Sequence, residues 1–154
     1  MKPDSDIRPE PGLAGSHPAR LAVGIIGAGR AGTALGAALA RAGHAVVAAS
    51  AVSDASVRRA RAAFPGAVIA EPPRVLALAD LALLTVPDDV LPGLVAGLAE
   101  TEAPLQGRML VHASGRHGLA VLDPAARRGG LPLALHPVMT FTGRGDDVDR
   151  LRGT

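Results

Sequence analysis

The chain has 154 residues, a formal net charge of +2 and a hydrophobic content of 48%, which suit one globular domain with a sizeable core. It contains no cysteine, which excludes disulfides, thiolate catalysis and cysteine-bound zinc, and we assign no metal site. Only two residues are aromatic and the basic residues are scattered, so nucleic-acid binding is not expected. No apolar run reaches transmembrane length, and we expect a cytoplasmic protein without a membrane partner.

Residues 1–20 are rich in proline, glycine and charge, and they predict a disordered leader without the apolar segment of a signal peptide. Strands and helices then alternate over residues 21–136. The predicted strands are residues 21–26, 45–49, 67–70, 81–86, 108–113 and 131–135. The predicted helices are residues 30–42, 53–64, 74–79, 90–98 and 118–128, the last interrupted by Pro124. This alternation predicts an α/β fold, a doubly wound parallel sheet (Rossmann fold) in a single domain.

Three details of this pattern predict positions within the fold. Strand 81–86 is almost wholly apolar and therefore central, whereas Pro132 places strand 131–135 at an edge. Asp88 is expected to cap the helix that follows it. Gly43 stands where a glycine ends a helix.

The stretch Gly27-Ala28-Gly29-Arg30-Ala31-Gly32 lies between the first predicted strand and the first predicted helix. In a dinucleotide site, Gly27 permits the tight turn, Gly29 leaves room for a pyrophosphate, and Gly32 lets the helix pack against the strand. The first turn of that helix then offers free N–H groups to an anion. A Gly-x-Gly-x-x-Gly pattern in this context predicts nucleotide binding.

The tip of the second strand, residues 48–53, selects the cofactor. NAD-specific folds carry an acid there to bind the ribose hydroxyls, but here the nearest acid, Asp54, comes several residues late. Ser50 and Ser53 can bind a 2′-phosphate through hydroxyls, and Arg58 or Arg59 can supply charge. The sequence therefore favours NADP(H) over NAD(H), although the two arginines also suit a solvated helix face.

Unusual residues also follow the three later strands, at the edge where doubly wound sheets bind ligands. Val86 and Pro87 are expected to border the nicotinamide, and Ser114-Gly115 offers a hydroxyl and a close backbone approach. His136 follows the last strand, where substrate would arrive. We therefore name Ser114 and His136 as candidate catalytic residues, and a purely structural histidine is the alternative. His112 is expected to be a hydrogen-bonded, partly buried histidine and His117 a surface residue.

Four segments together resemble the Rossmann-like oxidoreductases in which this domain precedes an all-helical C-terminal domain. They begin at Gly27, Val86, His112 and His136 and read GAGRAGTAL, VPDD, HASG and HPVMTF. These proteins are similar to pyrroline-5-carboxylate reductase, prephenate dehydrogenase and ketopantoate reductase. The resemblance covers about residues 22–142 and implies an NADP-dependent two-domain dehydrogenase. It also implies a helical domain that forms homodimers and closes the substrate cleft.

We do not expect such a helical domain within these 154 residues. We expect residues 137–154 to be an irregular tail or the start of a linker, and the chain to be the N-terminal part of a longer protein. The favoured function is the NADP(H)-binding domain of an oxidoreductase that passes hydride to or from a small carbonyl, imine or hydroxy substrate. On this view the fragment is inactive alone. The alternatives are a nucleotide-sensing or scaffold module without turnover, and a methyltransferase, which would need an acid where Ser50 stands.

Overall fold

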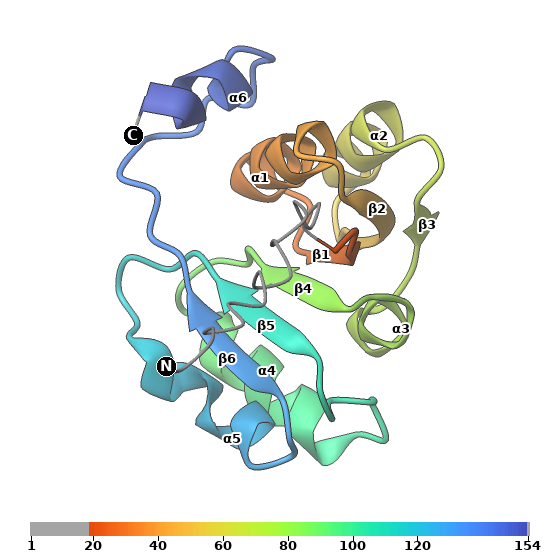
Figure 1. The fold of residues 1–154 in the computed structure, drawn as a ribbon, viewed down its shortest axis with the longest axis vertical. Helices are drawn as coiled ribbons and strands as arrows, with labels where there is room; N and C mark the ends of the chain where they lie inside the picture. The colour runs from red at the N-terminus through yellow and green to blue at the C-terminus, as the bar shows by residue number, and fades with distance from the viewer. Residues whose placement is uncertain (1–18, 154) are drawn as a thin grey trace, which may run out of the picture.

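The computed structural model describes residues 19–153, so most of the expected leader, residues 1–18, lies outside the described residues. Six parallel strands form one sheet in the order β3-β2-β1-β4-β5-β6 (Figure 1). The strands are β1 (Ala22–Ile26), β2 (Ala45–Ser50), β3 (Val68–Ile69), β4 (Leu81–Leu84), β5 (Met109–His112) and β6 (Leu131–Ala134). The doubly wound parallel sheet is thereby confirmed, with β4 central and the proline-containing β6 at an edge.

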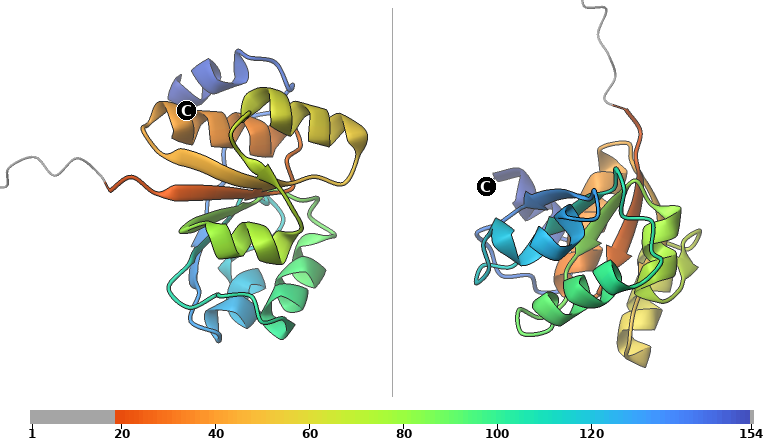
Figure 2. Two further views of the ribbon diagram at one scale, coloured as in Figure 1. Left: turned by 90° about the vertical axis from the view of Figure 1, so that its right-hand side faces the viewer. Right: turned by 90° about the horizontal axis from the view of Figure 1, so that it is seen from below.

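Helices cover both faces of the sheet. They are α1 (Arg30–Arg41), α2 (Asp54–Ala63), α3 (Pro72–Leu78), α4 (Leu91–Glu100), α5 (Asp123–Ala126) and α6 (Asp147–Arg150), with 3-10 turns η1 (Leu119–Leu122) and η2 (Leu151–Gly153). Figure 2 shows α1, α2 and α6 on one face and α3, α4 and α5 on the other. No helix among residues 19–153 is long and apolar enough to span a membrane.

Alternate residues of the strands supply two separate cores, as expected for parallel strands buried on both faces. Ile25 and Leu83 pack on the α1 side with Phe64, whereas Ile26 and Leu84 pack on the α3 and α4 side. Gly24 lets α3 come close, because a Cβ there would lie 2.7 Å from Cγ1 of Val75. The apolar interior therefore fixes the sheet between two helical layers.

The start of α4 differs from the expectation that Asp88 caps it. The N-cap residue is Val90, and no side chain caps the helix. The carbonyl of Pro87 instead accepts hydrogen bonds from the N–H groups of Val90 and Leu91, at 3.0 and 3.1 Å. The Asp88 cap was wrong because backbone groups in this turn already satisfy the helix start.

Two expectations about helix ends are confirmed. Gly43 follows α1 with φ of +99°, a left-handed conformation that favours glycine. The helical stretch around Pro124 is split into η1 and α5. Proline lies at the start of α5, where its missing N–H costs nothing.

The segment after β6, expected to be irregular, contains α6 and η2. Val148 is 7% exposed, and α6 packs on α1. The carboxylate of Asp147 accepts hydrogen bonds from the N–H and hydroxyl of Thr142, both at 2.9 Å, and from the N–H of Gly143 at 2.8 Å. We call residues 142–150 the terminal turn. It is ordered by one buried carboxylate and by its contact with α1.

Candidate functional site

The glycine turn after β1 adopts a conformation that requires glycine at its first position. Gly27 has φ of +94°, and a Cβ there would lie 2.9 Å from the backbone nitrogen of Val86. The hydroxyl of Ser50 accepts a hydrogen bond from the N–H of Gly27 at 3.2 Å, and the N–H of Ala28 donates to the carbonyl of Ser50 at 2.9 Å. The tip of β2 therefore holds the turn in place.

The third glycine brings α1 against the sheet. A Cβ on Gly32 would lie 2.4 Å from Oγ1 of Thr85 and 2.6 Å from the carbonyl oxygen of Gly27. The Thr85 hydroxyl donates to that same carbonyl at 2.9 Å. Thr85 thus ties the end of β4 to the glycine turn.

The second glycine has no packing reason to be glycine. A Cβ on Gly29 would meet no protein atom within 4 Å, and its φ of −80° is open to any residue. Gly29 is also the N-cap of α1, yet no side chain caps this helix and no acid occupies its first turn. The first N–H groups of α1, at Arg30, Ala31 and Gly32, have no acceptor within the helix. The arrangement places free N–H groups at the positive end of a helix beside empty space, which is favourable for an anion.

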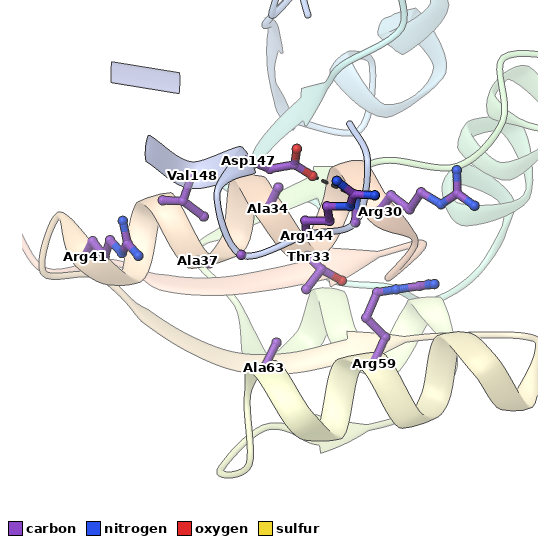
Figure 3. A pocket seen from close by; sticks show the side chains of 12 residues that line it. Arg30, Thr33, Ala34, Ala37, Arg41, Arg59, Ala63, Arg144, Asp147 and Val148 are labelled. Atoms are coloured by element: carbon purple, nitrogen blue, oxygen red, sulfur yellow. Dashed lines mark hydrogen bonds between the residues drawn. The ribbon is translucent and has the colours of Figure 1, made fainter. Parts of the chain in front are cut away.

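The residues expected to select the cofactor lie around the tip of β2. Ser50 is 9% exposed and its oxygen is occupied by Gly27, while the oxygen of Ser53 caps α2 by accepting from the N–H of Ser56 at 3.1 Å. Val52, two residues after the end of β2, is fully exposed. Arg58 points to solvent, and its neighbour Arg59 lines a pocket between α1 and α2 (Figure 3).

The candidate residues after β5 and β6 come together. A Cβ on Gly115 would lie 2.6 Å from Cε1 of His136, so the imidazole lies directly over this glycine. The Ser114 oxygen accepts from the N–H groups of Arg116 and His117, at 3.2 and 3.1 Å. Val86 contacts the glycine turn, because its Cγ1 lies 2.9 Å from the Cβ position of Gly27. Ser114, Gly115 and His136 therefore form one cluster at the carboxyl edge, and Pro87 is exposed at the same edge.

His112, at the end of β5, is 1% exposed. Its Nδ1 accepts a hydrogen bond from the N–H of Ser114 at 3.2 Å, so the proton of the neutral ring is on Nε2. Nε2 makes no well-formed hydrogen bond with the described residues, although the backbone of Gly118 acts on the ring, so the expected pairing of this histidine is found only in part. His117 is half-buried rather than on the surface, since its Nε2 donates to the carbonyl of Asp88 at 2.7 Å.

The pKa of His112 is lowered, and burial is the main cause. A hydrogen bond with the backbone of Gly118 raises the pKa, the charge of His117 lowers it further, and the charge of Asp88 raises it. Below the unfolded-state pKa of about 6.5, the unfolded chain then binds more protons than the folded one. Stability due to this group is complete above that pH and is lost as pH falls. Urea unfolding between pH 5 and 8 is therefore expected to show a smaller loss of stability on acidification in His112→Leu than in the wild type. Equal pH slopes would contradict the assignment.

No cluster of His, Asp or Glu able to hold a metal ion occurs within residues 19–153. Sequence reasoning missed Thr85 at the glycine turn, and it missed Arg144 and the carboxylate of Asp147 beside α1. Only the threonine had a signal, as the one polar residue in an apolar strand pattern. The other two depend on how the terminal turn packs on α1.

Comparison with known proteins agrees with this geometry. Solved structures that are similar to the chain include the following three, each matched over part of its length. A protein from Bacteroides fragilis, provisionally described as an NADP oxidoreductase, is 21% identical with a TM-score of 0.63 over 87% of this chain and 55% of its own. An imine reductase from Streptomyces aurantiacus is 29% identical, with a TM-score of 0.57 over 71% of this chain and 38% of its own.

A 3-hydroxyisobutyrate dehydrogenase from Mycobacterium tuberculosis is 18% identical, with a TM-score of 0.67 over 88% of this chain and 50% of its own. The chain thus spans about half or less of the length of these structures. No curated protein matches the sequence. The model of the Rossmann-like domain family matches residues 7–137. The chain therefore belongs to the Rossmann-like domain family.

Proposed function

We propose that this chain is the NADP(H)-binding domain of an oxidoreductase that transfers hydride to or from a small carbonyl, imine or hydroxy substrate. The observation that carries the proposal is Gly29. Packing explains Gly27 and Gly32, but Gly29 has open space around it and lies at an uncapped helix N-terminus. Space beside free N–H groups is what a pyrophosphate needs.

A nicotinamide cofactor fits the similar structures, which include an imine reductase and a 3-hydroxyisobutyrate dehydrogenase. Preference for the phosphorylated form rests on this chain's own residues. An acid at the β2 tip would repel a 2′-phosphate, and Ser50 stands there instead. A charged hydrogen bond to that phosphate contributes roughly 1.5–3 kcal/mol, or about ten- to a hundredfold in affinity.

The cluster of Ser114, Gly115 and His136 supports a substrate side at the ends of β5 and β6. When bound, the cofactor supplies the hydride chemistry, and the protein contributes orientation, exclusion of water and a proton donor. The exposed imidazole of His136 can hold that proton, while the Ser114 oxygen already accepts two backbone hydrogen bonds. We place the remaining wall of the cleft, and any homodimer contact, in a further helical domain.

Calorimetric titration with NADPH, NADH and S-adenosylmethionine tests this proposal. We expect NADPH to bind at least tenfold more tightly than NADH, and S-adenosylmethionine not to bind. Equal affinity for the two nicotinamide cofactors would remove the 2′-phosphate argument, and binding of none of the three would remove the function.

A second candidate is a nucleotide-sensing module without turnover. It is favoured by the engagement of the Ser114 oxygen in its own turn and by the burial of His112, which leave His136 as the exposed group able to exchange a proton among these three residues. Cofactor binding without any NADPH consumption by the longer protein, across carbonyl and imine substrates, would support it.

For the oxidoreductase, His136→Ala is expected to lower turnover by about 100-fold, in the range of lost general acid–base catalysis, while NADPH affinity stays within twofold. Gly115→Ala is the matched test, because its methyl group would displace the imidazole and lower turnover in the same way. Steady-state kinetics of the longer protein, with calorimetry for cofactor affinity, separate the two effects. Normal turnover in His136→Ala would return this residue to a structural role.

A further inference from the structure

A pocket of about 240 Å³ lies between α1, α2 and the terminal turn. Its polar lining includes Arg30 and Thr33 from α1, Arg59 from α2 and Arg144 from the terminal turn. Figure 3 shows Arg59 extending from α2 to the neighbourhood of Thr33, and Arg144 of the terminal turn on the other side of Thr33, near Asp147. We call it the arginine pocket. It is smaller than the roughly 300–1,000 Å³ of sites that enclose a whole small molecule, so it suits one chemical group.

The charges around the arginine pocket do not cancel. Arg41 also lines it but pairs with Asp149 at 2.7 Å. The carboxylate of Asp147 is fully buried, where hydrogen bonds and Arg150 at 3.4 Å already balance it. Three other arginines line the pocket: Arg30, Arg59 and Arg144. None of them forms an ion pair with any residue from 19 to 153. Three like charges around one cavity favour an anion as the occupant.

Thr33 gives a second, independent indication. Its hydroxyl oxygen is buried and has no hydrogen-bond partner within the described part of the chain. A buried hydroxyl without a partner is costly, and most such groups in proteins are satisfied. Thr33 lines the arginine pocket, so an occupant with acceptor oxygens would supply the missing hydrogen bond.

Arg144, which belongs to the terminal turn, is held beside the pocket by that turn. Gly143 has φ of +81°, and a Cβ there would lie 3.1 Å from Cγ of Arg30, so the turn rests on that side chain. Burial tends to raise the pKa of Asp147, but hydrogen bonds from Thr142 and Gly143, together with Arg150, hold it below its usual range. The carboxylate therefore stays charged, and it keeps the backbone of Arg144 beside the pocket at neutral pH.

We propose that the arginine pocket binds a phosphate monoester, with Arg30, Arg59 and Arg144 around its oxygens and the Thr33 hydroxyl donating to one of them. Two sources share this chemistry. One is the 2′-phosphate of NADP(H), because Arg30 follows Gly29 directly and Arg59 lies on the helix after the β2 tip. The other is free phosphate or a phosphorylated metabolite. Only the first source rests on the proposed function.

Calorimetric titration with inorganic phosphate at low ionic strength tests the site itself. We expect saturable binding that Arg59→Ala weakens at least tenfold and Thr33→Val weakens severalfold. Arg61→Ala is the matched control, since Arg61 is exposed, carries the same charge on the same helix and does not line the pocket. It is expected to leave affinity within twofold. No saturable binding, or equal losses in the two arginine variants, would overturn the proposal.

Titrating the same variants with NADPH and NADH identifies the source. If the 2′-phosphate occupies the pocket, Arg59→Ala weakens NADPH at least tenfold and leaves NADH unchanged, and phosphate competes with NADPH. If phosphate binds but the NADPH-to-NADH ratio does not respond, the site is retained with free phosphate as its ligand. Because the phosphate titration needs no dinucleotide, failure of the proposed function would leave the result on the arginine pocket readable.

Discussion

Replacing Gly29 by aspartate is expected to weaken NADPH binding by about 100-fold or more, while the folded domain becomes slightly more stable. The residue is the N-cap of α1 in an extended conformation, with open space around it. Aspartate is a better N-cap than glycine and suits the positive end of a helix, where a charge contributes about 0.3–1 kcal/mol. The same carboxylate would stand where the pyrophosphate binds and would repel it. Stability and affinity should therefore move in opposite directions.

Gly29→Asn separates the two causes, because asparagine caps a helix about as well as aspartate but carries no charge. It is expected to lose less NADPH affinity than Gly29→Asp and to gain similar stability. Calorimetry with NADPH and urea unfolding measure the two quantities. If Gly29→Asp binds NADPH normally, the dinucleotide site lies elsewhere. If Gly29→Asp instead destabilises the domain by several kcal/mol, the folded protein has no room for a side chain at Gly29.

The sequence predicted the parts of this molecule that depend on neighbours along the chain. Apolar runs of strand length, separated by helical stretches, were enough for the sheet and its two helical layers. Pro132 was enough to place β6 at an edge, because proline has no N–H to donate to the hydrogen bonds between strands in the middle of a sheet. The glycine turn was recognisable for the same local reason: a strand, three spaced glycines and a helix follow one another.

The parts that the sequence did not predict depend on distant contacts. Arg58 and Arg59 are neighbours, and only the docking of α2 beside α1 decides that Arg59 lines the pocket while Arg58 meets solvent. Arg144 comes from a segment without apolar periodicity, which is ordered by the buried carboxylate of Asp147. Gly24 has no local signal at all, yet it is the point where α3 approaches β1.

Gly32→Ala is expected to cost about 3 kcal/mol of folding stability, in the range for overpacked sites, and so a large share of the roughly 5–15 kcal/mol typical of a domain. The added methyl group would lie 2.4 Å from Oγ1 of Thr85, 2.6 Å from the carbonyl oxygen of Gly27 and 3.0 Å from Cγ2 of Ile25. The threonine can rotate, but the carbonyl belongs to the turn, so α1 must move away from β1. Each kcal/mol shifts Tm by about 2–4 °C in a chain of this size, so Tm should fall by about 6–12 °C.

Thr85→Ala in the same chain is not expected to rescue this variant, because it removes one clash, leaves the Gly27 carbonyl in place and deletes the hydrogen bond that ties β4 to the turn. Gly97→Ala is the control. It lies within α4, where an added Cβ meets nothing within 4 Å, and alanine there should raise stability by up to about 1 kcal/mol. Thermal unfolding followed by circular dichroism compares the three variants. A Gly32→Ala domain that melts with the wild type would show that α1 does not depend on this close approach, and that the third glycine of the turn serves the ligand rather than the fold.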